Sequence, residues 1–350
     1  MKKALALILS IALLLGCSLL TSCAEKKEKF SSYSFDYFDT VTTITGYEKS
    51  KEDFDKISNS ILEELRTYHR LFTIYDRYED LNNLCTINTL YSAEHRVVEV
   101  DQKIIDMLLF CKDMYQKTGG KVNVAMGSVL SIWHQYRSEG IDDPSSAKLP
   151  PKEDLEEAAM HTDISKLIID DEKNTVFLSD ARMSLDVGAI AKGYAVEMIA
   201  QMLIEKGITG YVLNVGGNVR TIGVRGDGSK WLAGIDDPNG TDDAPYYATV
   251  SLENLSLVTS GSYQRYYIVD GKNYNHIINP DTLMPSDMYT SVSVICESSA
   301  IADALSTSLF SMSVADGKAM LKDFQDVEVM WVGTDGKITY SQGFSQYISK

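Results

Sequence analysis

The chain has 350 residues and a formal net charge of −16. This acidic balance argues against nucleic acid as a partner and against a basic membrane-binding face. Beyond an N-terminal targeting segment, about 315 residues remain, which is enough for one large domain or two intimately packed lobes.

The N-terminus is typical of a lipoprotein signal peptide. Lys2 and Lys3 precede an apolar run over residues 4–15, and Leu-Thr-Ser leads into Cys23. The run is too short to predict a permanent membrane span. We therefore expect a signal peptide over residues 1–22, lipidation of Cys23, and a lipid anchor on the extracytoplasmic face of the cell membrane. A second processing site at Cys17 and plain secretion without a lipid are the alternatives.

Residues 23–34 are rich in Lys, Glu and Ser, and we expect a solvated tether there, followed by one folded domain over residues 35–350. Besides Cys23, the mature chain keeps three widely spaced cysteines, Cys85, Cys111 and Cys296. They form neither a disulfide framework nor a zinc pattern, so we expect buried thiols.

The first half of the domain mixes both kinds of element. A β-rich run covers residues 35–47, and apolar spacing predicts helices over 54–65 and 104–114, the second ending at Gly119 and Gly120. Residues 137–155 are loop-like because Gly and Pro interrupt them, and short strands are expected at 167–169 and 176–178.

The second half is mostly strands. They are expected at 211–215, 231–235, 246–252, 255–258, 266–269, 274–278, 291–296, 327–332 and 337–341, with a helix over 300–312. Strands and helices do not alternate strictly. We therefore predict an α+β fold with mixed, largely antiparallel sheets and packed helices.

A strand, a small-residue turn and a helix lie at the centre of the chain. A strand is expected to end over 183–187, Gly188 lies in the turn, and a helix begins near Ala191. Such a turn exposes backbone groups to a ligand, and Asp186 and Lys192 flank it. The pattern suits a phosphate-bearing or metal-bound ligand, although an ordinary corner with a surface ion pair fits it too.

Two further patterns contain side chains that could bind a metal or take part in catalysis. Asp303 and Thr307 lie four residues apart on a predicted helix and share one face, which suits Mg²⁺, although a plain polar face is the simpler interpretation. His276 ends a strand shortly before Pro280, and beside a phosphate and a metal it would serve as a general base.

The order of these motifs is more specific than any one of them. The chain reads Leu-Phe-Thr-Ile-Tyr75, Gly-Gly-Lys-Val-Asn123, Leu-Asp-Val-Gly-Ala-Ile-Ala-Lys-Gly-Tyr-Ala195, Asn-Val-Gly-Gly-Asn218, His-Ile-Ile-Asn-Pro280 and Ala-Asp-Ala-Leu-Ser-Thr307. From about residue 35 to the C-terminus this series resembles the ApbE family, the FAD:protein FMN transferases.

The resemblance implies an activity and a site. Family members hold Mg²⁺ beside the pyrophosphate of their substrate FAD and move the FMN half onto a Thr or Ser hydroxyl of another protein, releasing AMP. By position, the implied metal ligands are the backbone oxygen of Ala189 with Asp303 and Thr307. The implied catalytic residues are His276 and Asp303, of which His276 is the better base because a metal-bound Asp303 would be a poor one. The implied FAD contacts are Phe38, Tyr75, Lys121, Val122, Asn123, Asp186, Lys192 and Ile278.

Three positions depart from the family pattern. Phe38-Asp39-Thr40 replaces Met-Gly-Thr, Val122-Asn123 replaces Phe-Asp, and Asn279 replaces the Asp before Pro280. The second change removes a carboxylate from the expected adenine or ribose side, and the third removes a charge next to His276.

Three functions fit the sequence. The first is covalent flavinylation of extracytoplasmic redox proteins, and the second is a Mg²⁺-dependent FAD pyrophosphatase in which water replaces the protein hydroxyl. The third is a lipid-anchored flavin-binding protein without enzymatic activity. The Asp303 and Thr307 pair argues against the third, because a pure flavin binder needs no metal at the pyrophosphate.

Overall fold

The structure is a computed structural model that describes residues 27–94 and 96–349. The expected signal peptide and the lipidation site at Cys23 lie outside the described residues. Within them, no helix is both long and apolar enough to cross a membrane.

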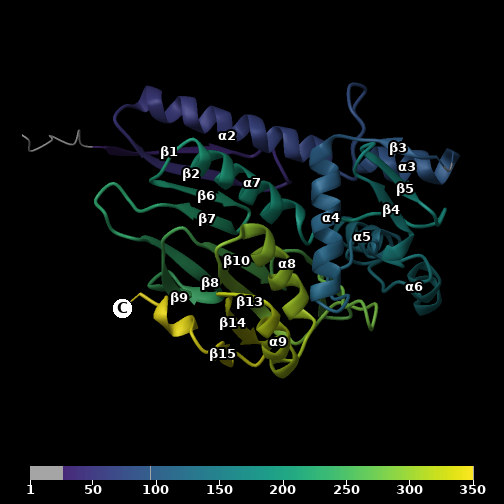
Figure 1. The fold of residues 1–350 in the computed structure, drawn as a ribbon. Coiled ribbons are helices and arrows are strands. Elements are labelled where there is room, and N and C mark those ends of the chain that lie inside the picture. The colour runs from purple at the N-terminus through teal and green to yellow at the C-terminus, as the bar shows by residue number, and fades with distance from the viewer. Residues whose placement is uncertain (1–26, 95, 350) are drawn as a thin grey trace, which may run out of the picture.

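An eight-stranded sheet forms the centre of the larger lobe (Figure 1). Every neighbouring pair in it is antiparallel. In spatial order its strands are β1 (Glu28–Ser34), β2 (Thr42–Glu48), β6 (Tyr211–Val215), β7 (Asn218–Ile222), β10 (Ser256–Gly261), β13 (Tyr289–Cys296), β14 (Glu328–Gly333) and β15 (Ile338–Tyr340).

Both faces of the central strands of this sheet are covered, so successive residues of β13 and β14 are buried whichever way they point. Helices α2 (Lys51–Phe72), α7 (Ala191–Glu205) and α8 (Ser299–Phe310) contribute to the main core on one face. On the other face, β8 (Trp231–Thr241) and β9 (Ala244–Leu252) pair as a long hairpin over a smaller core. Val294 and Ile295 of β13 accordingly belong to different cores.

The smaller lobe combines helices with a three-stranded sheet of order β3-β5-β4. Its elements are α3 (Leu84–Glu94), β3 (Val98–Glu99), α4 (Gln102–Lys117), α5 (Gly127–Asp142), α6 (Lys152–Ala159), η1 (Ile164–Lys166), β4 (Leu167–Asp170) and β5 (Thr175–Leu178). The remaining elements are the hairpin β11 (Tyr266–Val269) and β12 (Lys272–Asn275), then α9 (Val314–Met320), η2 (Leu321–Asp323) and η3 (Phe344–Gln346). Phe110 of α4 packs on Tyr194 of α7 with ring centroids 5.5 Å apart, so the two lobes share a core.

The predicted α+β class, with largely antiparallel sheets and two intimately packed lobes, is confirmed. The expected end of α4 is also confirmed, because Gly119 and Gly120 have φ of 60° and 82°. In the β11–β12 hairpin, Asp270 and Gly271 both adopt positive φ, as the predicted tight turn requires.

The prediction of a loop over residues 137–155 is wrong at both ends of the range. Helix α5 continues to Asp142, and α6 begins at Lys152. Gly140 does not stop the helix: it is buried, and a Cβ there would lie 2.7 Å from the ring of Tyr267. This glycine therefore permits close packing of β11 on α5 instead of breaking the helix.

The strand expected over residues 183–187 forms only one bridge, between Ser184 and Met126. The segment is extended and tied to its neighbour by two backbone hydrogen bonds, from Gly127 to the Ser184 carbonyl and from Asp186 to the Val124 carbonyl. Among the residues that the structure describes it pairs with no other strand, so no ladder develops there.

The prediction of a solvated tether over residues 23–34 is wrong for the second part of that segment. Glu28–Ser34 forms β1 and pairs in register with β2 along seven residues. Phe30 packs against the fully buried Phe54 of α2 with ring centroids 5.7 Å apart, and Ser32 hydrogen-bonds to Ser58 at 2.6 Å. The polar composition reflects an edge strand with one solvated face, and the folded domain begins earlier than predicted.

Removing β1 tests this boundary. A chain that starts at Phe35 should lose roughly 2–4 kcal/mol of unfolding free energy relative to one that starts at Lys27, because edge hydrogen bonds and the Phe30 contact disappear. Urea unfolding followed by circular dichroism measures the difference. A chain starting at Ala24 is the control and should match the chain from Lys27; equal stability of all three would show that β1 is dispensable.

Candidate active site

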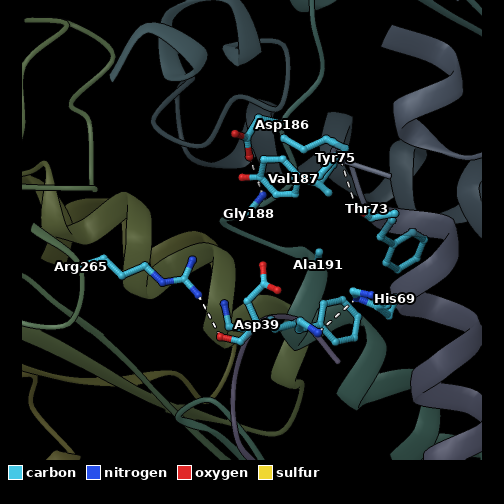
Figure 2. Close-up of a pocket in the computed structure, with 13 residues that line it drawn as sticks. Asp39, His69, Thr73, Tyr75, Asp186, Val187, Gly188, Ala191 and Arg265 are labelled. Carbon is cyan, nitrogen blue, oxygen red and sulfur yellow. Dashed lines mark hydrogen bonds between the residues drawn. The ribbon is translucent and has the colours of Figure 1, made fainter. Parts of the chain in front are cut away.

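A cleft of about 520 Å³ contains nearly all the predicted site residues. This volume lies within the range of about 300–1,000 Å³ usual for small-molecule sites. Eleven predicted residues line the cleft: Tyr75, Lys121, Val122, Asn123, Asp186, Ala189, Lys192, His276, Ile278, Asp303 and Thr307. The twelfth, Phe38, lines a side pocket of about 120 Å³ that shares Tyr75, Asp186 and Lys192 with the cleft (Figure 2).

The turn before α7 is held by Asp186. Its Oδ1 accepts a hydrogen bond from the Gly188 N–H at 2.8 Å, which closes the turn. Burial raises the pKa of Asp186, and the Gly188 hydrogen bond and the electrostatic influence of His134 and Arg137 oppose that rise. The carboxylate therefore shapes the backbone that presents Gly188 and Ala189 to the cleft.

Helices α7 and α8 approach unusually closely beside the cleft. The Gly193 N–H donates a 2.8 Å hydrogen bond to Oδ2 of Asp303. A Cβ at position 193 would lie 2.4 Å from the Asp303 Cβ, so only glycine allows this approach. Asp303 is 4% exposed, and its burial raises its pKa, with the Lys192 cation as the largest opposing influence.

The predicted metal ligands suit a hard divalent cation. Gly193 is the third residue of α7, so its N–H is one of those that a helix N-terminus leaves without an intrahelical partner, and it donates to Asp303. Ala189 lies before the helix, and no donor among the described residues reaches its carbonyl oxygen. The Thr307 hydroxyl has only a 3.5 Å contact, to Ser260. A carboxylate, a hydroxyl and a free carbonyl are ligands that Mg²⁺ prefers. No described group of three or more His, Cys, Asp or Glu forms an alternative site.

His276 is held as a neutral imidazole. Its Nδ1 lies 3.1 Å from the Arg265 carbonyl, so Nδ1 is the protonated nitrogen of that tautomer and Nε2 carries the lone pair. Burial lowers the pKa of His276 to about 4, and the cations of Arg137, Arg265 and Lys192 act in the same direction. The imidazole is therefore a proton acceptor throughout the neutral range.

Tyr75 is positioned by a residue that the sequence analysis missed. The phenol is 59% exposed, its hydroxyl lies 3.3 Å from Nδ1 of His134, and the two ring centroids are 5.4 Å apart. His134 and Arg137 both project from α5 into the cleft. Their three-residue spacing on one helix face was the available signal, but it was lost because residues 137–155 were expected to be a loop.

Lys121, Val122 and Asn123 line the cleft, but their side chains are mostly buried or bonded to other residues of the chain. Lys121 forms an ion pair with Asp281, and Val122 is 2% exposed. The Asn123 amide bridges two backbone groups: Nδ2 donates to the Thr162 carbonyl at 2.8 Å, and Oδ1 accepts from the Ala125 N–H at 2.9 Å.

Phe38 and Asp39 both have positive φ, 57° and 49°. Asp39 stands where the family pattern has glycine, and aspartate is among the few side chains that adopt this conformation readily. The Phe38 N–H donates to Nδ1 of His69 at 3.2 Å, and the Arg265 guanidinium reaches the Asp39 carbonyl (Figure 2). The left-handed turn is therefore kept without glycine.

The lowered pKa of His276 predicts a pH-dependent stability difference. Between pH 6.5 and about 4 the unfolded imidazole binds a proton that the folded one does not. The unfolding free energy of the wild type, relative to His276→Gln, should therefore fall as the pH falls through this window and level off above it. Urea titrations of both proteins at several pH values measure this; a constant difference, or an imidazole NMR titration near pH 6.5, would contradict it.

Comparison with known proteins gives a consistent result. The model of the ApbE family matches residues 38–331. The chain is 32% identical over 260 residues to a FAD:protein FMN transferase of Treponema pallidum, covering 70% of each protein. It is 29% identical over 280 residues to one of Klebsiella pneumoniae, covering 78% of this chain and 84% of that protein.

Solved structures agree in fold. The ApbE protein of Thermotoga maritima superposes with a TM-score of 0.79 at 28% identity, over 92% of this chain and all of that one. The flavin transferase ApbE of Vibrio cholerae, at 23% identity, gives a TM-score of 0.75 over 92% and 99% of the two chains. Together with the site geometry, these matches show that the chain belongs to the ApbE family.

Proposed function

We propose that this protein is a Mg²⁺-dependent FAD:protein FMN transferase, which attaches FMN to a Thr or Ser hydroxyl of an acceptor protein through a phosphoester bond. Flavin transfer to proteins is the activity for which its relatives are named. The observation that carries the proposal is that Ala189, with a carbonyl that no described donor reaches, lines the same cleft as Asp303 and Thr307, and that this cleft is large enough for a small-molecule substrate.

In the proposed reaction the acceptor oxygen attacks the phosphorus of the FMN half of FAD. The new bond joins that oxygen to phosphorus, the pyrophosphate P–O bond breaks, and AMP leaves with the bridging oxygen. Mg²⁺ bound at this site would neutralise charge that develops on the phosphates. Lys192, Arg137 and Arg265 all line the cleft and complement the anionic substrate in an otherwise acidic chain.

His276 is the group we propose to accept the hydroxyl proton. Its Nδ1 is engaged by the Arg265 carbonyl, so Nε2 is left to act as the acceptor. A base of low pKa takes up the proton only when negative charge lies nearby, and the phosphates of bound FAD would supply that charge. Asp303 is less suited, since its oxygens serve Gly193 and the proposed metal.

We also propose that the protein works as a lipoprotein, anchored through Cys23 on the extracytoplasmic side of the membrane. The support is the N-terminal sequence pattern alone. Its acceptors would then be extracytoplasmic redox proteins with an accessible Thr or Ser.

The test is one incubation of the domain from Lys27 onward with FAD, Mg²⁺ and a flavin-accepting protein domain. AMP release and FMN addition to the acceptor, followed by chromatography and intact mass, should proceed in equal amounts. Asp303→Asn should lower both rates at least about 100-fold, because it removes the only carboxylate of the proposed metal site.

Asp113→Asn is the matched control. Asp113 is an exposed α4 residue paired with Lys117 at 2.7 Å and outside the cleft, so both rates should stay at the wild-type level. Free FMN and AMP in equal amounts regardless of the acceptor would instead assign a pyrophosphatase. Retention of intact FAD with no AMP would assign a flavin-binding protein.

A further inference from the structure

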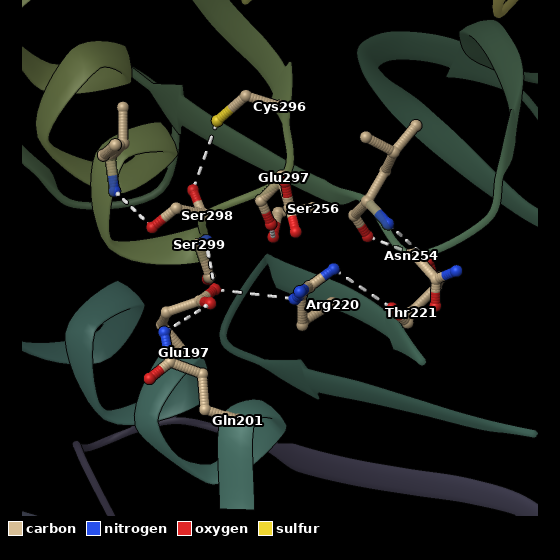
Figure 3. A network of polar contacts seen from close by, with 12 residues as sticks. Glu197, Gln201, Arg220, Thr221, Asn254, Ser256, Cys296, Glu297, Ser298 and Ser299 are labelled. Atoms are coloured by element: carbon tan, nitrogen blue, oxygen red, sulfur yellow. Dashed lines mark hydrogen bonds and ion pairs between the residues drawn. The ribbon is translucent and has the colours of Figure 1, made fainter. Parts of the chain in front are cut away.

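A buried ion pair lies next to the cleft but does not line it (Figure 3). Nε of Arg220 on β7 is 3.5 Å from Oε2 of Glu197 on α7, and the two side chains are 2% and 6% exposed. Removing two charges from water costs about as much as their attraction returns, so such a pair is weak evidence for a stabilising role. Its second contact indicates a different role.

The same Glu197 oxygen accepts a 2.8 Å hydrogen bond from the N–H of Ser299, the first residue of α8. The connection that leads into α8 is also fixed: the Cys296 thiol donates to the Ser298 carbonyl at 3.2 Å, and the Ser256 hydroxyl donates to the Glu297 carbonyl at 3.0 Å (Figure 3). The start of α8 is thus held against α7 by a buried carboxylate.

The contacts between α7 and α8 repeat every four residues in opposite order along the two helices. Glu197 meets Ser299, and Gly193 meets Asp303. The next step in the same direction leads to Ala189, two residues before α7 begins, and to Thr307; both line the cleft. Four residues are about one helical turn, so the two contacts lie along one seam between α7 and α8, which runs toward the cleft.

We propose that Glu197 is a positioning residue for the metal site, because its hydrogen bond with the Ser299 N–H fixes the register of α8 on α7. This inference rests on the proposed function, since it concerns the same Ala189, Asp303 and Thr307 ligands. If α8 shifted along α7, Asp303 would lose the Gly193 N–H that orients it, and Thr307, one turn further along α8, would move with it. One displacement would then disturb two of the three ligands.

Two double variants isolate the Ser299 hydrogen bond at constant charge. Both carry Arg220→Met, so no buried cation is left unpaired. In Glu197→Gln/Arg220→Met, residue 197 keeps an oxygen that accepts the Ser299 N–H. In Glu197→Met/Arg220→Met, a side chain of similar length has no such acceptor.

The readout is Mn²⁺ binding in the presence of FAD, followed by electron paramagnetic resonance, with urea unfolding to establish that each variant is folded. We expect the Met/Met protein to bind Mn²⁺ about 10–100-fold more weakly than wild type, the usual effect of losing a group that orients a metal ligand. The Gln/Met protein should bind Mn²⁺ close to the wild-type level.

A second pair of variants covers the case in which the double variants do not fold. Ser299→Pro removes the donating N–H together with the hydroxyl, at the first helical position where proline is tolerated, and Ser298 before it is already extended with ψ of 120°. Ser299→Ala keeps the N–H and removes a hydroxyl that has no partner in the described structure. The Pro variant should lose Mn²⁺ affinity and the Ala variant should keep it.

Wild-type Mn²⁺ affinity in both the Met/Met and the Ser299→Pro proteins would overturn the positioning role and leave the proposed function intact. Asp303→Asn separates the other case. If wild type and Asp303→Asn bind Mn²⁺ equally, the metal site itself is wrong, and the inference falls together with the proposed function.

Discussion

The close approach of α7 and α8 at Gly193 is the constraint on which the rest of the site depends. Without a side chain at this position, Asp303 comes near enough to accept the Gly193 N–H at 2.8 Å. That bond satisfies an N–H in the first turn of α7 that has no partner within the helix, and no described donor reaches the Ala189 carbonyl just before the helix. A single glycine therefore orients a carboxylate beside an unpaired backbone oxygen.

The electrostatics of the cleft follow from burial combined with a few cations. The chain carries a net charge of −16, yet Lys192, Arg137 and Arg265 all line the cleft. Burial raises the pKa of Asp186 and of Asp303, and in both cases neighbouring cations and backbone N–H groups oppose the shift. The cleft thus offers positive charge to an anionic substrate while it keeps two buried carboxylates for geometry and for the proposed metal.

Sequence periodicity predicted most elements, because both faces of the main sheet and the inner faces of its helices are buried. The predictions failed where a residue has a role other than the one that its type usually indicates. Glycine usually breaks a helix, but Gly140 lies inside α5 and allows a close contact with Tyr267. The loop predicted there is therefore wrong, and for that reason the sequence analysis missed His134 and Arg137 of α5. The Lys- and Glu-rich start of β1 was taken as a tether because an edge strand needs few apolar residues. The motif order, by contrast, brought together residues that lie more than a hundred positions apart, such as Ala189 and Asp303, which no local pattern predicts and which line the same cleft.

The departures from the family pattern show which property of a side chain each position uses. Asn123 and Asn279 stand where the family has aspartate, and each uses its Oδ1 to accept a backbone N–H two residues later, from Ala125 and Asp281. An amide oxygen serves this turn as well as a carboxylate does. Asp39 likewise keeps a left-handed backbone where the family has glycine. At these three positions the residues present support a local turn of the backbone, and Asn123 and Asn279 do so without a charge, whereas the proposed role of Asp303 needs the charge itself.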